Sequence, residues 1–204
     1  FIPGVPPAPR RKLFPAHPIY EQTTAVAVRD RGTIKVKGFR LKETLESGQF
    51  FRWKEEEGTF TLWTGGQDFQ IRQEGSRLRI EGAALDFVDR FLGIPDPVTS
   101  IRRTLGKETA LRPALEAGKG IRILRQDPWE CLVAFVTSQV SNIPRITQNL
   151  ETLVQYLGVP ASNGFHFPAP ERVKNEKQLR QLGFGFRAKY IAQIAKEVEK
   201  GALE

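Results

Sequence analysis

A change of hydrophobic period near Gly82 is the feature that most constrains the fold of this chain. Before that glycine, apolar and polar residues alternate with period two in the runs TAVAVR, TIKVK, FFRWKE, TFTLWT, DFQIRQ and RLRIE. Glycine-rich turns separate the runs, a pattern typical of antiparallel strands with one buried face and one polar face. The sequence therefore predicts a twisted antiparallel β-sheet that ends at about residue 82.

After Gly82 the apolar residues recur at helical spacing, first in short helices predicted over 84–93 and 96–105. The predicted fold class is α+β, with an N-terminal twisted antiparallel β-sheet domain followed by an all-helical domain. The predicted organisation is a proline-rich N-terminal arm (1–23), an antiparallel β domain (24–100) and a helical domain (101–204).

The clearest helix begins after Asp127. This residue is a typical N-cap, Pro128 occupies the first helical position and Glu130 completes a capping box. The pattern predicts a buried stripe that consists of Leu132, Val133, Phe135 and Val136.

Three further helices follow the segment VSN. The first is predicted to bury Ile146, Leu150, Leu153, Val154 and Leu157 on one side. A polar helix is expected near 171–182. The last helix starts after the segment LGFGF, and is predicted to bury Tyr190, Ile191, Ile194 and Val198. Gly201 is its predicted C-terminal stop.

The composition favours an anionic partner. The net charge is +8 and the pI is about 9.8, which indicates nucleic acid first and an acidic membrane surface second. A single cysteine excludes an internal disulfide and fits an intracellular protein, and no apolar run is long enough to span a membrane. Two histidines exclude a multi-histidine metal site, and no phosphate-binding loop is visible, so we expect neither a metal nor a cofactor.

Basic residues stand where helices normally carry acidic ones. Arg145 lies in the first turn after Asn142, and Arg187 and Lys189 lie in the first turn after Phe186. The partial positive charge of a helix N-terminus disfavours these cations unless an anion binds there, as in a nucleic-acid interface. The alternative is that they reach the C-terminal carbonyls of a neighbouring helix.

The segment LGFGF places two phenylalanines two residues apart. If the segment is extended, Phe184 and Phe186 cannot both face the core, and an exposed aromatic beside cations can stack on bases or wedge between them. The alternative, which the residues alone slightly favour, is that both side chains pack inward around the bend.

Three stretches together resemble the 8-oxoguanine DNA glycosylases of the helix-hairpin-helix superfamily. They are LKETLESGQFFRW (41–53), GIRILRQDPWECLVAFVTSQVSNIPRIT (120–147) and LRQLGFGFRAKYI (179–191), and they occur in the order of the family. The resemblance extends from about residue 24 to 200. It implies base excision DNA repair, in which 8-oxoguanine is flipped out of double-stranded DNA and its N-glycosidic bond is cleaved.

The resemblance assigns roles to particular residues. Gly48 would offer its main-chain carbonyl to the N–H that oxidised guanine carries at N7, and a glycine permits that close approach. Arg145 and Arg187 match arginines that hold the cytosine opposite the lesion, and Phe186 matches an aromatic that wedges into the duplex.

The segment QVSN departs from the asparagine-rich run of the family. Val140 falls on the asparagine that fills the space left by the flipped base, Ser141 falls on its neighbour, and only Asn142 is retained. The stretch SQVS is closer to the related alkylated-base (3-methyladenine) glycosylases, which remain an alternative.

The family carries a catalytic lysine in a PGVG-type hairpin after the RAKYI helix, and these 204 residues contain no such hairpin. No catalytic residue is therefore expected in this chain, and AP-lyase strand nicking would belong to a missing segment. A non-catalytic damaged-DNA-binding module is the second alternative. The expected partner is double-stranded DNA that contains oxidised guanine, bound by a monomer.

Overall fold

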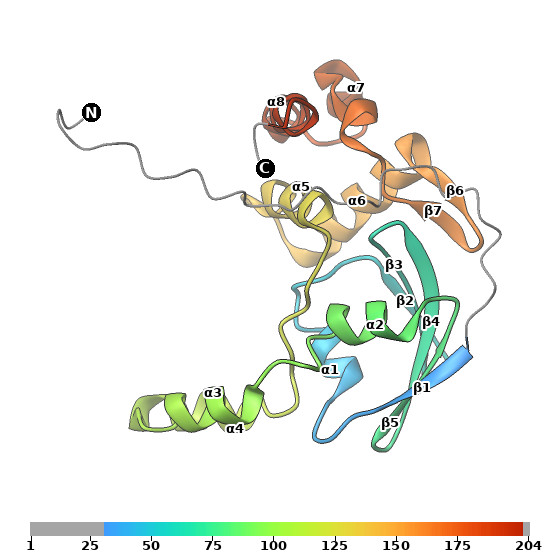
Figure 1. The fold of residues 1–204 in the computed structure, drawn as a ribbon. Helices are drawn as coiled ribbons and strands as arrows, with labels where there is room; N and C mark the ends of the chain where they lie inside the picture. Colours follow the sequence, from blue (N-terminus) through green and yellow to red (C-terminus); the bar gives the residue numbers. More distant parts are fainter. Residues whose placement is uncertain (1–30, 202–204) are drawn as a thin grey trace.

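The computed structural model describes residues 31–201, and its sheet and its long helices form separate parts of the molecule (Figure 1). The first part is a five-stranded antiparallel sheet with the strand order β1-β5-β4-β3-β2. Its strands are β1 (Arg31–Lys35), β2 (Trp53–Glu56), β3 (Thr59–Thr64), β4 (Gln67–Glu74) and β5 (Arg77–Glu81). The predicted α+β class is confirmed.

Among the described residues, most of the predicted runs form strands. The run TAVAVR and the proline-rich arm lie outside the described residues. The run FFRWKE is only partly a strand, because β2 begins at Trp53. Phe50 is buried in the core of the sheet, whereas Phe51 packs against the core of the helices. The two phenylalanines thus connect the two cores before the strand starts.

The inner face of the sheet forms the first core together with α1 (Leu41–Leu45) and α2 (Leu85–Phe91). Cross-strand pairs such as Phe60 with Ile71 and Leu62 with Phe69 are fully or almost fully buried. The hydrophobic alternation read from the sequence therefore sets the strand register, since a slip of one residue would expose this whole face.

A helical excursion follows α2 and extends away from the sheet (Figure 1). It consists of α3 (Val98–Leu105), the 3₁₀ turn η2 (Thr109–Leu111) and α4 (Arg112–Ala117). No residue of these elements is buried. The chain returns to the first core at Leu124.

The second part of the molecule is helical. Its elements are α5 (Pro128–Ser138), α6 (Ile143–Leu157), the hairpin β6 (Val159–Ala161) and β7 (Gly164–His166), η3 (Pro170–Val173), α7 (Glu176–Gln181) and α8 (Arg187–Glu199). The five predicted core residues of α6 are buried as expected. The polar helix predicted near 171–182 is instead divided into η3 and α7, and Asn175 caps α7 by accepting a hydrogen bond from the Gln178 N–H.

Two predicted core positions are wrong, and Leu132, Ile194 and Val198 are only half-buried. Phe135 is 67% exposed and Tyr190 is 51% exposed. On α5 the buried face is set by Trp129, Val133, Val136 and Thr137, which leaves Phe135 on the opposite side. On α8 small residues occupy the buried face, with Ala188, Ala192 and Ala195 beside Ile191. The positions of large apolar side chains therefore predicted the buried faces of α5 and α8 incorrectly.

The two cores divide the chain between Leu124 and Trp129. The boundary predicted at residue 100 stays a prediction, and we propose that the later position marks the division more closely. None of the helices found between residues 31 and 201 combines the length and apolar character that a membrane crossing requires.

Candidate nucleic-acid interface

The turn after α1 brings Gly48 against the beginning of α6. Gly48 has a φ of +81°, a conformation that side chains other than glycine rarely adopt. A Cβ atom at this position would lie 3.3 Å from the Ile143 Cδ1 atom. Ser47 closes the turn, because its hydroxyl donates to the Thr44 carbonyl at 2.7 Å. The turn and the first residue of α6 therefore form one surface.

Gln49 fixes this turn to the segment that leads into α5. Its side-chain oxygen accepts a hydrogen bond from the Leu124 N–H, and its amide nitrogen donates to the Arg122 carbonyl, both at 2.8 Å. The Gln126 amide donates in return to the Gln49 carbonyl at 2.5 Å. Sequence reasoning missed this role, because a glutamine beside Gly48 carries no pattern that names its distant partners.

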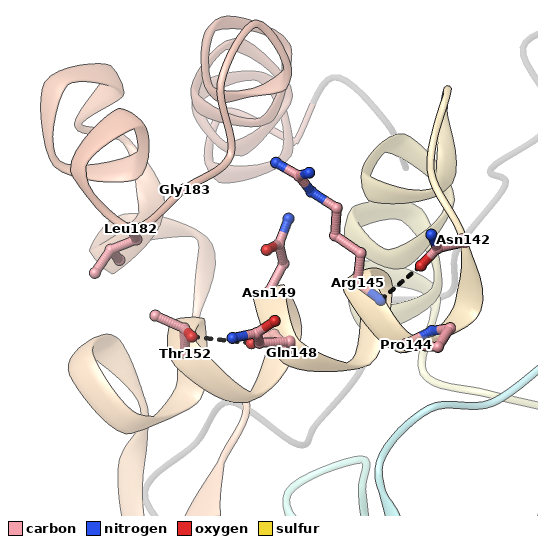
Figure 2. A pocket seen from close by; sticks show the side chains of 8 residues that line it. All are labelled: Asn142, Pro144, Arg145, Gln148, Asn149, Thr152, Leu182 and Gly183. Carbon is pink, nitrogen blue, oxygen red and sulfur yellow. Dashed lines mark hydrogen bonds between the residues drawn. The ribbon is translucent and has the colours of Figure 1, made fainter.

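The turn between α5 and α6 is strained and exposed. Val140 has a φ of +50°, although a β-branched side chain makes this conformation costly, and it is 91% exposed. The Ser141 hydroxyl is buried and has no hydrogen-bond partner among the described residues. Asn142 then caps α6, because its side-chain oxygen accepts from the Arg145 N–H at 3.0 Å (Figure 2).

Arg187 is buried and binds the end of α5. Its Nε donates to the Gln139 carbonyl and its Nη2 to the Val140 carbonyl, both at 2.8 Å, and Nη2 also contacts the Gln139 carbonyl. This is the alternative foreseen for these basic residues, a cation on the C-terminal carbonyls of a neighbouring helix. Burial and three hydrogen bonds therefore make Arg187 a positioning residue for the Val140 turn in this structure.

Phe184 and Phe186 separate, one inward and one outward. Phe184 is fully buried, whereas Phe186 is 49% exposed and its ring centroid lies 4.7 Å from the Arg187 guanidinium carbon. The expectation that both pack inward is therefore wrong. Gly183 and Gly185, with φ values of +90° and +56°, permit the bend that turns the two rings apart.

Arg145 and Lys189 are the exposed cations of this surface. Within residues 31–201 neither forms an ion pair. Arg145 extends from the first turn of α6 toward the α7–α8 loop (Figure 2). A basic residue in the first turn of a helix thus has two outcomes. Arg187 in α8 is buried and held by hydrogen bonds, whereas Arg145 in α6 is exposed and free to bind a ligand.

A buried carboxyl group joins the two parts of the molecule. Glu130 in α5 accepts a hydrogen bond from the Gly65 N–H at 3.2 Å, and burial raises the pKa of its carboxyl group to about 8. Asp127 raises this pKa further, whereas the charge of Arg52 opposes the shift. The N-cap at Asp127 is confirmed by its hydrogen bond with the Glu130 N–H at 3.0 Å, but the buried side chain of Glu130 was not foreseen.

Comparison with known proteins identifies the family. The sequence profile of the N-terminal domain of 8-oxoguanine DNA glycosylase matches residues 33–132. N-glycosylase/DNA lyase OGG1 of Arabidopsis thaliana is 32% identical over 171 residues, which is 74% of this chain and 46% of the relative. The chain belongs to the 8-oxoguanine DNA glycosylase family.

A second curated relative matches a shorter part of the chain. The N-glycosylase/DNA lyase of Saccharomyces cerevisiae is 42% identical over 94 residues, covering 42% of this chain and 25% of the relative. The chain therefore spans less than half the length of these curated relatives.

The fold agrees with solved 8-oxoguanine glycosylase structures. A structure of MBOgg1 in complex with a low-affinity DNA ligand has a TM-score of 0.79 and 34% identity, with coverage of 85% of this chain and 64% of that one. The apo form of the 8-oxoguanine glycosylase/lyase of Clostridium acetobutylicum has a TM-score of 0.78 at 24% identity, covering 86% and 66%. The second likeness supports the fold.

Proposed function

We propose that this chain provides the lesion- and DNA-recognition part of a DNA glycosylase and AP lyase that removes 8-oxoguanine from duplex DNA in base excision repair. The observation that carries the proposal is the proximity of Ile143 to the Gly48 turn, since a Cβ atom on Gly48 would lie 3.3 Å from the Ile143 Cδ1 atom. Because Ile143 opens the helix that bears Asn142 and Arg145, a lesion-reading turn and the contacts to the opposite strand share one surface.

In this proposal Gly48 discriminates the lesion. The N7–H that distinguishes 8-oxoguanine from guanine donates to the Gly48 carbonyl, and guanine lacks this donor. A site built around one specific hydrogen bond strongly rejects the analogue that cannot form it. The fixed position of the turn, which Gln49 ties to Arg122 and Leu124, supports such a reader.

The other surface residues act on the strand opposite the lesion. Phe186 wedges into the duplex where the lesion is extruded, and its 49% exposure supports that role. Arg145 contacts the orphaned cytosine, and Asn142 and Lys189 border the same strand. Val140 and Ser141 lie beside the gap that the flipped base leaves. Arg187 supports this region by holding the Val140 turn, and its own contact with the cytosine is part of the proposal.

The protein acts as a monomer on double-stranded DNA inside the cell, in the nucleus or in the cytoplasm and its nucleoid. The charge of +8 supports an electrostatic contribution to DNA binding that weakens steeply with salt.

The proposal is tested by replacing Gly48 with alanine and measuring the dissociation constants for duplexes with and without 8-oxoguanine. We expect Gly48→Ala to reduce the lesion preference by about tenfold or more while binding to undamaged duplex changes little. Gly58→Ala is the matched control, because Gly58 has a φ of +77° at a hairpin tip with nothing near its Cβ position. It introduces the same backbone strain without touching the proposed site.

Equal loss on both duplexes would remove the discriminating role of Gly48. A wild-type preference for 3-methyladenine duplexes over 8-oxoguanine duplexes would favour the alkylated-base alternative, to which the segment SQVS (138–141) is more similar.

A further inference from the structure

An open cavity of about 410 Å³ lies between α6 and the loop that joins α7 to α8 (Figure 2). Asn142 and Arg145 belong to the surface described above, but most of the lining is new. The additional polar lining comes from Gln148, Asn149 and Thr152 of α6. The cavity is within the size range of small-ligand sites in proteins.

The lining of this cavity is basic and rich in hydrogen-bond donors. It contains no acidic side chain and one cation, Arg145. The first turn of α6 also has no acidic residue, so the partial positive charge of the helix N-terminus is not offset there. The electrostatic environment therefore favours an anion.

Asn149 supplies an independent observation that points to a ligand. Its side chain is only 8% exposed, and its amide nitrogen is buried without a hydrogen-bond partner in the described part of the chain. In Figure 2 this nitrogen points to the same side of the cavity as the guanidinium group of Arg145. Two donor groups thus face one region, and the Asn149 amide nitrogen has no acceptor among the described residues.

Gly183 leaves the opposite wall open. It has a φ of +90°, and a Cβ atom there would approach only the Asn149 side-chain oxygen, at 3.9 Å. The α7–α8 loop therefore lets the backbone of another molecule come close to Asn149. An acceptor group that carries negative charge and belongs to an extended chain fits all of these features.

We propose that this cavity binds a backbone phosphate of the undamaged DNA strand, with Arg145 and Asn149 as its two donors. The inference rests on the proposed function, which puts Arg145 beside the base opposite the lesion. Arg145 can contact both the cytosine and this phosphate, because a guanidinium group carries five N–H donors. As the partner of the remaining donors and of Asn149, a phosphate fits better than a second base edge, because a base presents donors as well as acceptors.

The test is a scan of the undamaged strand with methylphosphonates, each of which removes the charge of one phosphate. Dissociation constants are measured by fluorescence anisotropy for the wild-type protein and for Asn149→Asp. We expect one methylphosphonate near the orphaned cytosine to weaken wild-type binding about three- to tenfold. Asn149→Asp should weaken binding to unmodified duplex by a similar factor, and that same methylphosphonate should cause it no further loss.

Two further variants separate this effect from misfolding and from added charge. Gln148→Glu places a carboxylate at an exposed position of the same cavity, so it should reproduce the effect even if Asn149→Asp is unstable. Gln193→Glu makes the same change of charge at an exposed position of α8, and should leave the phosphonate profile as in the wild type.

The phosphate site would be overturned if, at every position, Asn149→Asp and the methylphosphonate changed the dissociation constant independently of each other. The phosphate site would also be overturned if the effect of Asn149→Asp depended on an abasic residue in the undamaged strand and on no methylphosphonate. The cavity would then contact a base. The scan can be repeated on undamaged duplex. If the wild-type protein bound damaged and undamaged duplexes equally well but kept the methylphosphonate effect, the proposed function would be refuted and the phosphate site would remain supported.

Discussion

Helix α5 is attached to the rest of the protein at its two ends by a buried acidic group and a buried basic group. At its start, Glu130 faces the sheet and accepts a hydrogen bond from Gly65. Beyond its end, Arg187 of α8 donates to the carbonyls of Gln139 and Val140. The positive charge of Arg187 has the sign that the helix dipole favours at a C-terminus, and an ionised Glu130 would have the favoured sign at the N-terminus.

The two ends differ in how fully the charge is compensated. Arg187 has three hydrogen bonds to carbonyls that would otherwise lack partners at a helix end. At the other end the pKa of Glu130 is raised to about 8, so the folded protein holds this carboxyl group in its neutral form at neutral pH. Burial thus fixes a permanent charge at one end and creates a pH-dependent contact at the other.

The largest effect is expected at the end of α5. Arg187→Ala removes the donors of the Gln139 and Val140 carbonyls and should reduce the free energy of unfolding by about 3 kcal/mol, measured by urea denaturation. Lys189→Ala removes an exposed cation from the same turn of α8 and should change stability by less than about 0.5 kcal/mol. Equal effects of the two changes would show that the carbonyl contacts contribute little.

The start of α5 should make stability depend on pH. Because the pKa of Glu130 is about 8 in the folded protein and near 4.5 when unfolded, the unfolded chain releases its proton first as pH rises. The free energy of unfolding then falls between these values by up to about 1.4 kcal/mol per pH unit, or about 2 kcal/mol from pH 6 to 7.5. Glu130→Gln should remove this slope in urea titrations at the two pH values.

The matched control is Glu116→Gln, since the Glu116 side chain is 73% exposed in its ion pair with Arg102. It should keep the wild-type slope. A slope that persists unchanged in Glu130→Gln would contradict a raised pKa of this group as its source.

The smallest effect concerns the strain next to Arg187. Val140→Gly relieves the φ of +50° and should raise the free energy of unfolding by about 0.5–1 kcal/mol, because glycine adopts this conformation without steric cost. If Arg187 holds the turn in this shape, the gain should shrink in the Arg187→Ala background. Glu57 also has a φ of +50° but lies in the β2–β3 hairpin, so Glu57→Gly should raise the free energy of unfolding equally with and without Arg187. If the gain from Glu57→Gly also shrank in the Arg187→Ala background, the coupling between Arg187 and the Val140 turn would be disproved.

Local signals in the sequence were sufficient for much of this fold. Asp127 and Asn142 predict the starts of α5 and α6, because an N-cap side chain accepts a hydrogen bond from an N–H only three residues away. The alternation in β3 to β5 and the stripe of α6 likewise need no knowledge of distant partners, since periodicity alone separates the buried face from the exposed one.

The remaining features depend on contacts between distant segments. Arg187 binds carbonyls 47 and 48 positions away, and Gln49 bonds to groups 73 and 75 positions away. The local sequence does not distinguish an arginine that becomes buried, such as Arg187, from one that stays exposed, such as Arg145. The roles assigned to the surface residues therefore stay predictions. The sequence did not indicate that Arg187 supports the Val140 turn from within, or that Asn149 has an unpartnered amide nitrogen.

The excursion of α3 and α4 has a consequence for how this architecture can vary. Its helices bury no residue, and the chain rejoins the core at Leu124, next to the Gln49 contacts. Doubling the length of a connection adds only about 0.6 kcal/mol to its closure free energy. This segment is therefore the natural place for evolution to lengthen or shorten the chain, or for an engineer to insert a reporter domain, while both cores and the Gly48 turn keep their geometry.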